Sequence, residues 1–210
     1  KSYQRYIDKY LSLGIDVCLA QKTAMEDVRR EFEQGFQGWE YKFNTVASSR
    51  GDYPFITVTA GLGTSCFEKM ATISMLKVRQ RGQGRPECRK PVLFPKIVFL
   101  YDEELHGPGK ELEEVFETGV ECSARSMYPD WLSLSGKGYV AGIYKRYHKA
   151  ISPMGCRAFL SPWYERGGMT PADDEDVPVF VGRFNIGAVS LHLPMIYARA
   201  KHESRDFYEV

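Results

Sequence analysis

The sequence predicts an α/β fold in which parallel strands alternate with helices. Two apolar runs, 54–60 and 92–102, are rich in aliphatic and β-branched residues and indicate buried strands. An amphipathic pattern long enough for a crossover helix follows each of them. This alternation is typical of βαβ units that build a parallel sheet.

Helices are expected before the first strand. Residues 1–13 place tyrosines at helical spacing, and a longer helix is predicted over 23–46. Thr23 is the expected N-cap of the longer helix because Glu26 follows three residues later, as in a capping box. The cluster SSRGDYP at 48–54 then predicts a turn ahead of the strand.

The elements after the first strand become less regular toward the end of the chain. Helices are predicted over 64–81 and 109–130, the second ending at Pro129. The later predicted elements are a short strand near 139–147, a strand or hairpin over 179–194 and a helix that begins near Pro194. The basic, glycine-rich stretch RQRGQGR at 79–85 is open to two interpretations, a solvated loop or a loop that meets phosphates.

The bulk composition limits the classes of function. The chain has 210 residues, of which 43% are hydrophobic, enough for one domain with a single core. Its formal net charge of +1 predicts no general attraction to nucleic acid or to a membrane surface. No apolar run approaches the roughly 20 residues of a membrane helix. We therefore expect no nucleic-acid and no membrane partner. Reduced cysteines, which the cysteine pattern favours, indicate a cytoplasmic protein.

The five cysteines are odd in number and widely spaced. Because no CxxC pair or His/Cys cluster appears, neither a disulfide scaffold nor a metal site is expected within the chain. Cys66 and Cys122 fall in helical patterns and are predicted to pack in the core. The four histidines show no ligand spacing and are expected on the surface or, hydrogen-bonded, in the core. They are His106, His148, His192 and His202.

Two residues admit a structural and a functional interpretation. Cys156 follows a glycine that permits a tight turn, so it is either a buried small hydrophobe or a thiol projected into a cavity. Asn185 lies between Phe184 and Ile186, where an amide either belongs to a turn or hydrogen-bonds a ligand in an apolar pocket. The residues themselves leave both alternatives open.

Several stretches, in order, resemble one enzyme family. Two stretches resemble the core motifs of the anaerobic (class III) ribonucleotide reductases, which are glycyl radical enzymes. They are SPMGCRAFLSPW at 152–163 and VGRFNIGAVSLHLP at 181–194. Upstream stretches are also similar in order: NTVASSRG, LKVRQRGQG, PVLFPKIVF and ECSARSMYPD. The resemblance covers about residues 19–200. The family commonly has LNLPRI where this chain has LHLPMI, which puts any role of His192 and Met195 in doubt.

The resemblance implies a fold. Such enzymes form a ten-stranded α/β barrel from two five-stranded parallel halves, with a finger loop inside. The chain is then expected to be a partial catalytic barrel domain over 1–210, about one parallel half-barrel with its crossover helices and the finger loop. Its expected parts are a helical lead-in (1–50), strand and helix units (51–151), the finger loop (152–161), a loop insertion (162–181) and a strand with a helix (182–210).

The resemblance also implies catalytic residues. By motif position, Cys156 is the finger-loop cysteine whose thiyl radical takes the ribose 3′-hydrogen of a ribonucleoside triphosphate. Asn185 is the amide that orients the ribose hydroxyls. Weaker correspondences assign substrate binding to four further residues, which are Met154, Ser48, Ser49 and Phe55.

The cofactors and partners implied by the resemblance lie largely outside the sequence. The chain lacks an initiator methionine and is expected to be an internal piece of a longer protein, inactive by itself. A glycyl radical and a structural zinc site are expected on a C-terminal part absent here. An iron–sulfur enzyme that uses S-adenosylmethionine is expected to create the radical, and formate to act as reductant. ATP or deoxyribonucleotide effectors and a homodimer are expected for the full-length protein.

Two rival hypotheses remain. The chain could belong to another glycyl radical enzyme of the lyase or dehydratase type, although GRFNIG does not suit that class. Alternatively, it could be a non-catalytic fragment used for nucleotide binding or assembly.

Overall fold

The computed structural model describes residues 1–45, 51, 56–153, 159–163, 168–181 and 191–209. The chain divides into two compact units, Lys1–Phe180 and Val181–Val210, which are described separately. Among the described residues, no helix is both long enough and apolar enough to cross a membrane.

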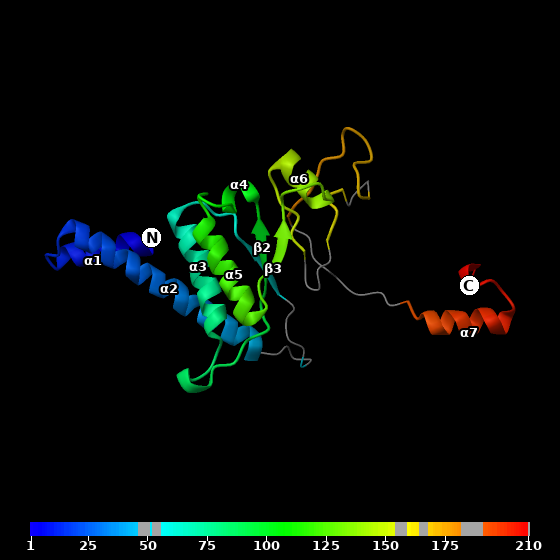
Figure 1. Cartoon of the computed structure of the whole chain (residues 1–210), viewed down its shortest axis with the longest axis horizontal. Helices are drawn as coiled ribbons and strands as arrows, with labels where there is room; N and C mark the ends of the chain where they lie inside the picture. The colour runs from blue at the N-terminus through cyan, green and yellow to red at the C-terminus, as the bar shows by residue number, and fades with distance from the viewer. Residues whose placement is uncertain (46–50, 52–55, 154–158, 164–167, 182–190, 210) are drawn as a thin grey trace. The chain divides into compact units, whose positions relative to one another are not determined.

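A three-stranded parallel sheet forms the centre of the first unit (Figure 1). The strands β1 (Thr57–Ala60), β2 (Lys96–Tyr101) and β3 (Asp130–Ser133) lie in the order β1-β2-β3. Thr59 is opposite Val98, and Val98 is opposite Asp130, so these three residues share one face of the sheet. The α/β class and the parallel arrangement predicted from the sequence are confirmed.

Two helices cover the opposite face of the sheet. Helices α3 (Cys66–Arg81) and α5 (Glu113–Ser126) lie side by side in Figure 1. They bury a core cluster against β2, made of Leu76, Phe99, Leu112, Val115 and Cys122. These are the crossover helices that the alternating pattern predicts.

Two predictions near β3 are wrong, the end of one helix and the type of one element. The helix predicted over 109–130 ends at Ser126, because Met127 takes a left-handed conformation with φ 57° that stops the helix. The strand expected near 139–147 is the helix α6 (Tyr139–Tyr147), and the strand lies earlier, as β3. Tyrosine and valine favour strands, but the apolar residues there recur every three to four positions and bury one helix face.

The chain starts with a helical hairpin, α1 (Ser2–Ser12) and α2 (Val17–Thr45). The predicted N-cap at Thr23 is wrong, because α2 has already begun and the Thr23 hydroxyl donates to the Leu19 carbonyl at 2.8 Å. Asp16 caps the helix instead, since its carboxylate accepts from the Cys18 amide at 2.9 Å. The hydroxyl of Tyr6 on α1 donates to Glu31 on α2 at 2.8 Å and helps to join the two helices.

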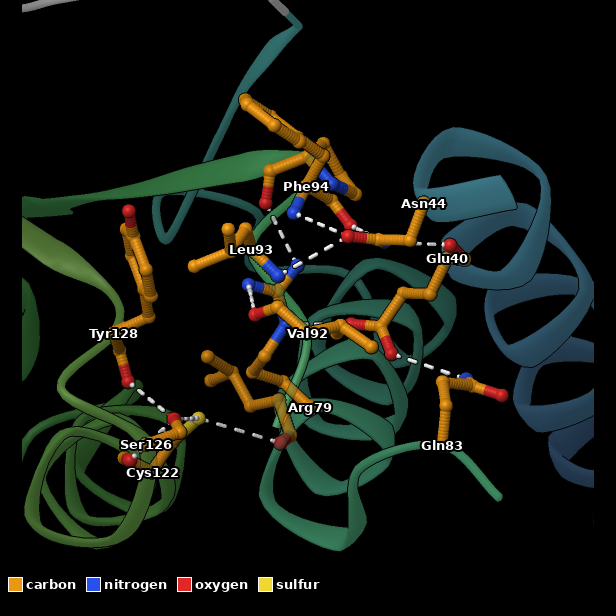
Figure 2. Close-up of polar contacts among 12 residues, drawn as sticks. Glu40, Asn44, Arg79, Gln83, Val92, Leu93, Phe94, Cys122, Ser126 and Tyr128 are labelled. Carbon is orange, nitrogen blue, oxygen red and sulfur yellow. Dashed lines mark hydrogen bonds and ion pairs between the residues drawn. The ribbon is translucent and has the colours of Figure 1, made fainter. Parts of the chain in front are cut away.

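A buried ion pair links α2 to α3. Arg79 Nε donates to Glu40 Oε1 at 2.6 Å (Figure 2). Arg79 Nη2 donates to the Pro95 carbonyl at 2.7 Å. Asn44 on α2 donates to the Phe94 carbonyl at 2.6 Å. These contacts hold the segment before β2 against both helices.

The remaining elements of the first unit are short. They are the helix α4 (Glu103–His106) and the 3₁₀ helix η1 (Pro86–Cys88). The described part of the expected loop insertion forms no helix or strand. It packs Trp163 and Phe180 against Tyr147 of α6, each with ring centroids 5.9 Å apart.

The second unit contains α7 (Leu193–Glu203) and the 3₁₀ helix η2 (Phe207–Glu209). The predicted helix start near Pro194 is confirmed. His192 is the N-cap, and its Nδ1 accepts from the Met195 amide at 2.9 Å. Most of the strand or hairpin predicted over 179–194 lies outside the described residues.

Candidate functional site

All six predicted site residues lie outside the described residues. This applies to both assigned catalytic residues, Cys156 and Asn185. It also applies to the four residues assigned to substrate binding, which are Met154, Ser48, Ser49 and Phe55. The described surroundings therefore come from the residues that flank these segments.

The two ends of the predicted finger loop lie against the sheet. The hydroxyl of Ser152 shares a hydrogen bond with that of Thr59 on β1. On either side of the segment 154–158, Pro153 and Phe159 line one cavity of about 310 Å³. The other walls of this cavity come from β2 and β3, through Val98, Asp130, Trp131 and Leu132.

The lining places this cavity mainly on the sheet face that α3 and α5 leave free. The register sets Val98 and Leu132 on that face, whereas Phe99 on the opposite face packs into the core beneath the helices. The cavity is thus bounded mostly by apolar side chains, with one carboxylate from Asp130. Apolar walls next to a loop end limit the access of water to a reacting group.

The same face becomes polar toward the start of β1. Thr57 lies opposite Lys96 and two residues before Thr59, so both threonines are on this face of the sheet. Its hydroxyl is buried and makes no hydrogen bond among the residues that the structure describes. A buried hydroxyl without a partner is rare and marks a place where a further polar group would fit.

A second cavity was not predicted from the sequence. It has a volume of about 660 Å³ and lies between α4 and α6, where β2 and β3 end. A sequence signal for it exists: Gly136, Gly138 and Ala141 form a GxGxxA pattern directly after β3. The pattern was missed because a strand, instead of a helix, was expected over 139–147.

The basic stretch 79–85 is partly buried. Arg79 is neutralised by Glu40 inside the protein and is not available to a phosphate. Arg81 is half-exposed and pairs with Glu33 at 2.9 Å. This stretch therefore offers less free positive charge than its composition indicates.

One of the two predictions that a cysteine packs in the core is confirmed and the other is wrong. Cys122 is buried as predicted, its thiol donates to the Leu76 carbonyl at 3.4 Å, and burial raises its pKa. Cys66 is exposed, so the prediction that it packs in the core is wrong. It occupies the first position of α3, directly after the N-cap, where a side chain points into solvent.

The histidines have the expected environments. His106 is buried, and its Nε2 hydrogen-bonds the Gly61 carbonyl at 2.8 Å while Nδ1 accepts from the Asp102 amide at 3.1 Å. The other three, His148, His192 and His202, are exposed. In the part of the chain that the structure describes, no group of three or more metal-ligating side chains is arranged to hold an ion.

Comparison with known proteins gives consistent matches. The family model described as anaerobic ribonucleoside-triphosphate reductase matches residues 2–210. Proteins of that name are similar to the chain at 34% identity over 192 residues in Salmonella typhimurium and 35% over 182 residues in Escherichia coli. The protein of that name from Enterobacteria phage T4 is 34% identical over 199 residues.

The aligned regions cover most of this chain but little of the relatives. They include 91%, 86% and 91% of the chain, and 25%, 23% and 30% of the three relatives in the same order. The chain therefore spans about a quarter of the length of the curated relatives that it matches.

Proposed function

Because this chain belongs to the anaerobic ribonucleoside-triphosphate reductase family, we propose that it supplies the thiyl-radical segment of an enzyme that reduces ribonucleoside triphosphates. The family match over residues 2–210 carries the proposal. We assign the radical to Cys156 because SPMGCRAFL lies within that match and resembles the finger-loop motif of the family.

The proposed reaction begins and ends at the Cys156 sulfur. The Cys156 thiol would give its hydrogen atom to a glycyl radical on a segment outside this chain, which would leave the unpaired electron on the sulfur. The sulfur then takes the 3′-hydrogen of the ribose, and the 2′-hydroxyl takes up a proton and leaves as water. At the end of the reaction the thiol returns a hydrogen atom to C3′, which restores the sulfur radical. Formate is oxidised to carbon dioxide and, with one proton, provides the two electrons that convert the ribonucleotide into the deoxyribonucleotide.

The described surroundings suit this chemistry. Hydrogen-atom transfer needs no thiolate but does need a dry and closely positioned site. The ends of the predicted finger loop border a mainly apolar cavity and are tied to β1 through Ser152 and Thr59. We assign the orientation of the ribose hydroxyls to Asn185, because small misplacements of a substrate cost rate steeply.

We further propose that the sheet is part of one parallel half of a ten-stranded barrel. Parallel strands with α3 and α5 on one face, and the described ends of the predicted finger loop next to the other, support this arrangement. In the same proposal, the full-length protein is a homodimer with nucleotide effectors, a radical-activating enzyme and a structural zinc site beyond this chain. The 210-residue chain by itself is then inactive.

The test is substitution in the full-length protein. We expect Cys156→Ala to abolish ribonucleotide reduction, while the glycyl radical still forms and is detected by electron paramagnetic resonance. Asn185→Ala should impair turnover strongly with the same radical signal. Cys66→Ala is the matched control, because Cys66 is exposed at the start of α3, and it should keep normal activity. Normal turnover by Cys156→Ala would contradict the assignment.

A further inference from the structure

The cavity between α4 and α6 lies where parallel sheets commonly bind ligands. The β2 and β3 arrowheads in Figure 1 point toward these two helices. The volume of about 660 Å³ is within the usual range for small-molecule sites. In α/β sheets, ligands bind just outside the carboxyl ends of the strands. The reaction proposed above uses none of the residues that line this cavity.

The cavity has an acidic and a basic set of side chains. Asp102, which follows β2, is acidic, as are Glu103 and Glu104 on α4. Lys110 and Lys145 are basic, and His148 also lines the cavity. Among the residues that the structure describes, no salt bridge joins the two sets. A ligand with both an anionic group and hydroxyl donors would satisfy both sets.

Existing contacts position these side chains. Lys145 Nζ donates to the Gly136 carbonyl at 3.1 Å, which keeps its charge next to the loop after β3. Burial, together with the Asp102 carboxylate, raises the pKa of the Tyr144 phenol. The acidic side chains form no cluster of three ligands suited to a metal ion in the described part of the chain. Hydroxyl groups therefore suit the acidic set better than a cation.

The loop between β3 and α6 leaves its backbone open to a ligand. Gly136 has φ 107°, a conformation that favours glycine. Gly138 is the N-cap of the nine-residue α6, and no side chain caps the helix there. A Cβ atom at Gly138 would meet no atom within 4 Å, so the packing of the described residues does not require a glycine. In a GxGxxA turn between a strand and a helix, open backbone of this kind lets phosphate groups approach the amides.

From its volume, its separate acidic and basic side chains and the accessible backbone of the glycine loop, we infer that this cavity binds a nucleoside phosphate. Its phosphate groups contact Lys110, Lys145 and the amides of the glycine loop. Its ribose hydroxyls donate to Asp102 and Glu104, because a carboxylate at the end of the neighbouring strand is placed to accept from a ribose. The inference does not rest on the radical reaction.

Hydrogen–deuterium exchange of the full-length protein tests this inference, with ATP as the probe. We expect ATP to slow exchange in peptides covering residues 134–148, and adenosine or inorganic phosphate at the same concentration to have little effect. The absence of slowing with ATP, or equal slowing with inorganic phosphate or adenosine alone, would overturn the inference. Cys156→Ala should keep the protection, which separates this result from the test of the radical site.

Substitutions of two lysines test the proposed contacts to the phosphate groups. Lys145→Gln and Lys110→Gln should each weaken the apparent affinity for ATP at this peptide about tenfold, since each removes a charge-assisted contact. Lys77→Gln is the matched control, because Lys77 is exposed on α3 and does not line the cavity, and it should bind as the unchanged protein does. Unchanged affinity in both Lys145→Gln and Lys110→Gln would overturn the phosphate assignment.

Deoxyadenosine triphosphate tests the hydroxyl contacts. It should bind more weakly than ATP, and Asp102→Asn should reduce the difference between the two nucleotides, because an amide accepts less strongly from the 2′-hydroxyl. Asparagine keeps the capping oxygen that accepts from the Glu104 amide, so the fold of α4 is preserved. Equal affinity of the two nucleotides in the unchanged protein would overturn the ribose assignment.

Discussion

Arg79 and Glu40 are charged side chains with almost no exposed surface, 0% and 2%. Both have more than one partner, since Arg79 also donates to the Pro95 carbonyl and Glu40 accepts from Gln83 at 3.3 Å. Charges buried in this way are tolerated only when their hydrogen bonds are satisfied. The pair therefore sets how α2, α3 and the start of β2 fit together.

Breaking this pair should destabilise the protein strongly. We expect Glu40→Ala to lower the free energy of unfolding by about 3–5 kcal/mol, because it leaves the Arg79 guanidinium buried without its counter-ion. Glu33→Ala is the matched control, since it breaks a partly exposed pair with Arg81 and should cost about 1 kcal/mol or less. Urea unfolding of the chain measures both values. Similar losses in the two variants would contradict this view of the pair.

At the level of elements, α3 shows how a local sequence determines a helix start. Ser65 accepts from the Glu68 amide, and the Glu68 carboxylate accepts from the Ser65 amide at 3.0 Å, which completes a capping box. The Ser65 hydroxyl also donates to the Glu68 carboxylate at 2.6 Å, and this hydrogen bond, together with that from the Ser65 amide, holds the pKa of Glu68 below its usual value. The helix start therefore depends on an ionised carboxylate.

The capping box should make the stability of α3 sensitive to acid. Because the pKa of Glu68 is lower in the folded state, its contribution is fully present above the unfolded-state pKa and is lost as pH falls through the folded-state pKa. Glu68→Gln should remove this part of the pH dependence, measured by unfolding experiments between neutral and acidic pH. Ser65→Ala should cost about 1 kcal/mol at neutral pH, whereas Ser65→Thr should retain most of the cap. An unchanged acid profile in Glu68→Gln would contradict the prediction.

At the scale of the whole molecule, β1 and β3 are the edge strands of the sheet formed by the described residues of the first unit. In the part of the chain that the structure describes, β1 and β3 each pair only with β2. Unpaired strand edges present free backbone donors and acceptors that favour association with other strands. In the proposed barrel, further strands of the longer protein would cover these edges.

The 210-residue chain should therefore self-associate in solution. We expect its average mass in analytical ultracentrifugation to rise with concentration. Ser133→Lys, which puts a charge on the exposed edge of β3, should reduce the association. Ser12→Lys adds the same charge to an exposed position on α1 and should leave it unchanged. A chain that remains monomeric at all concentrations would contradict this expectation.

The sequence by itself determined the order of most helices and strands, the parallel sheet and the family. These features follow from signals within short segments: apolar runs, capping residues and motifs in a fixed order. The assignments of Cys156 and Asn185 come from the motifs alone and stay predictions, since both residues lie outside the described part of the chain.

Only the tertiary structure decided which charges are buried and where cavities form. Arg79 belongs to a basic stretch in the sequence, yet its partner Glu40 is 39 positions away on another helix. The side chains that line the cavity beyond β2 and β3 likewise come from segments distant in the chain, although the helix over 139–147 and the glycine loop before it have local sequence signals. Burial and pairing are properties of surfaces that only folding brings together, so no local pattern could predict them.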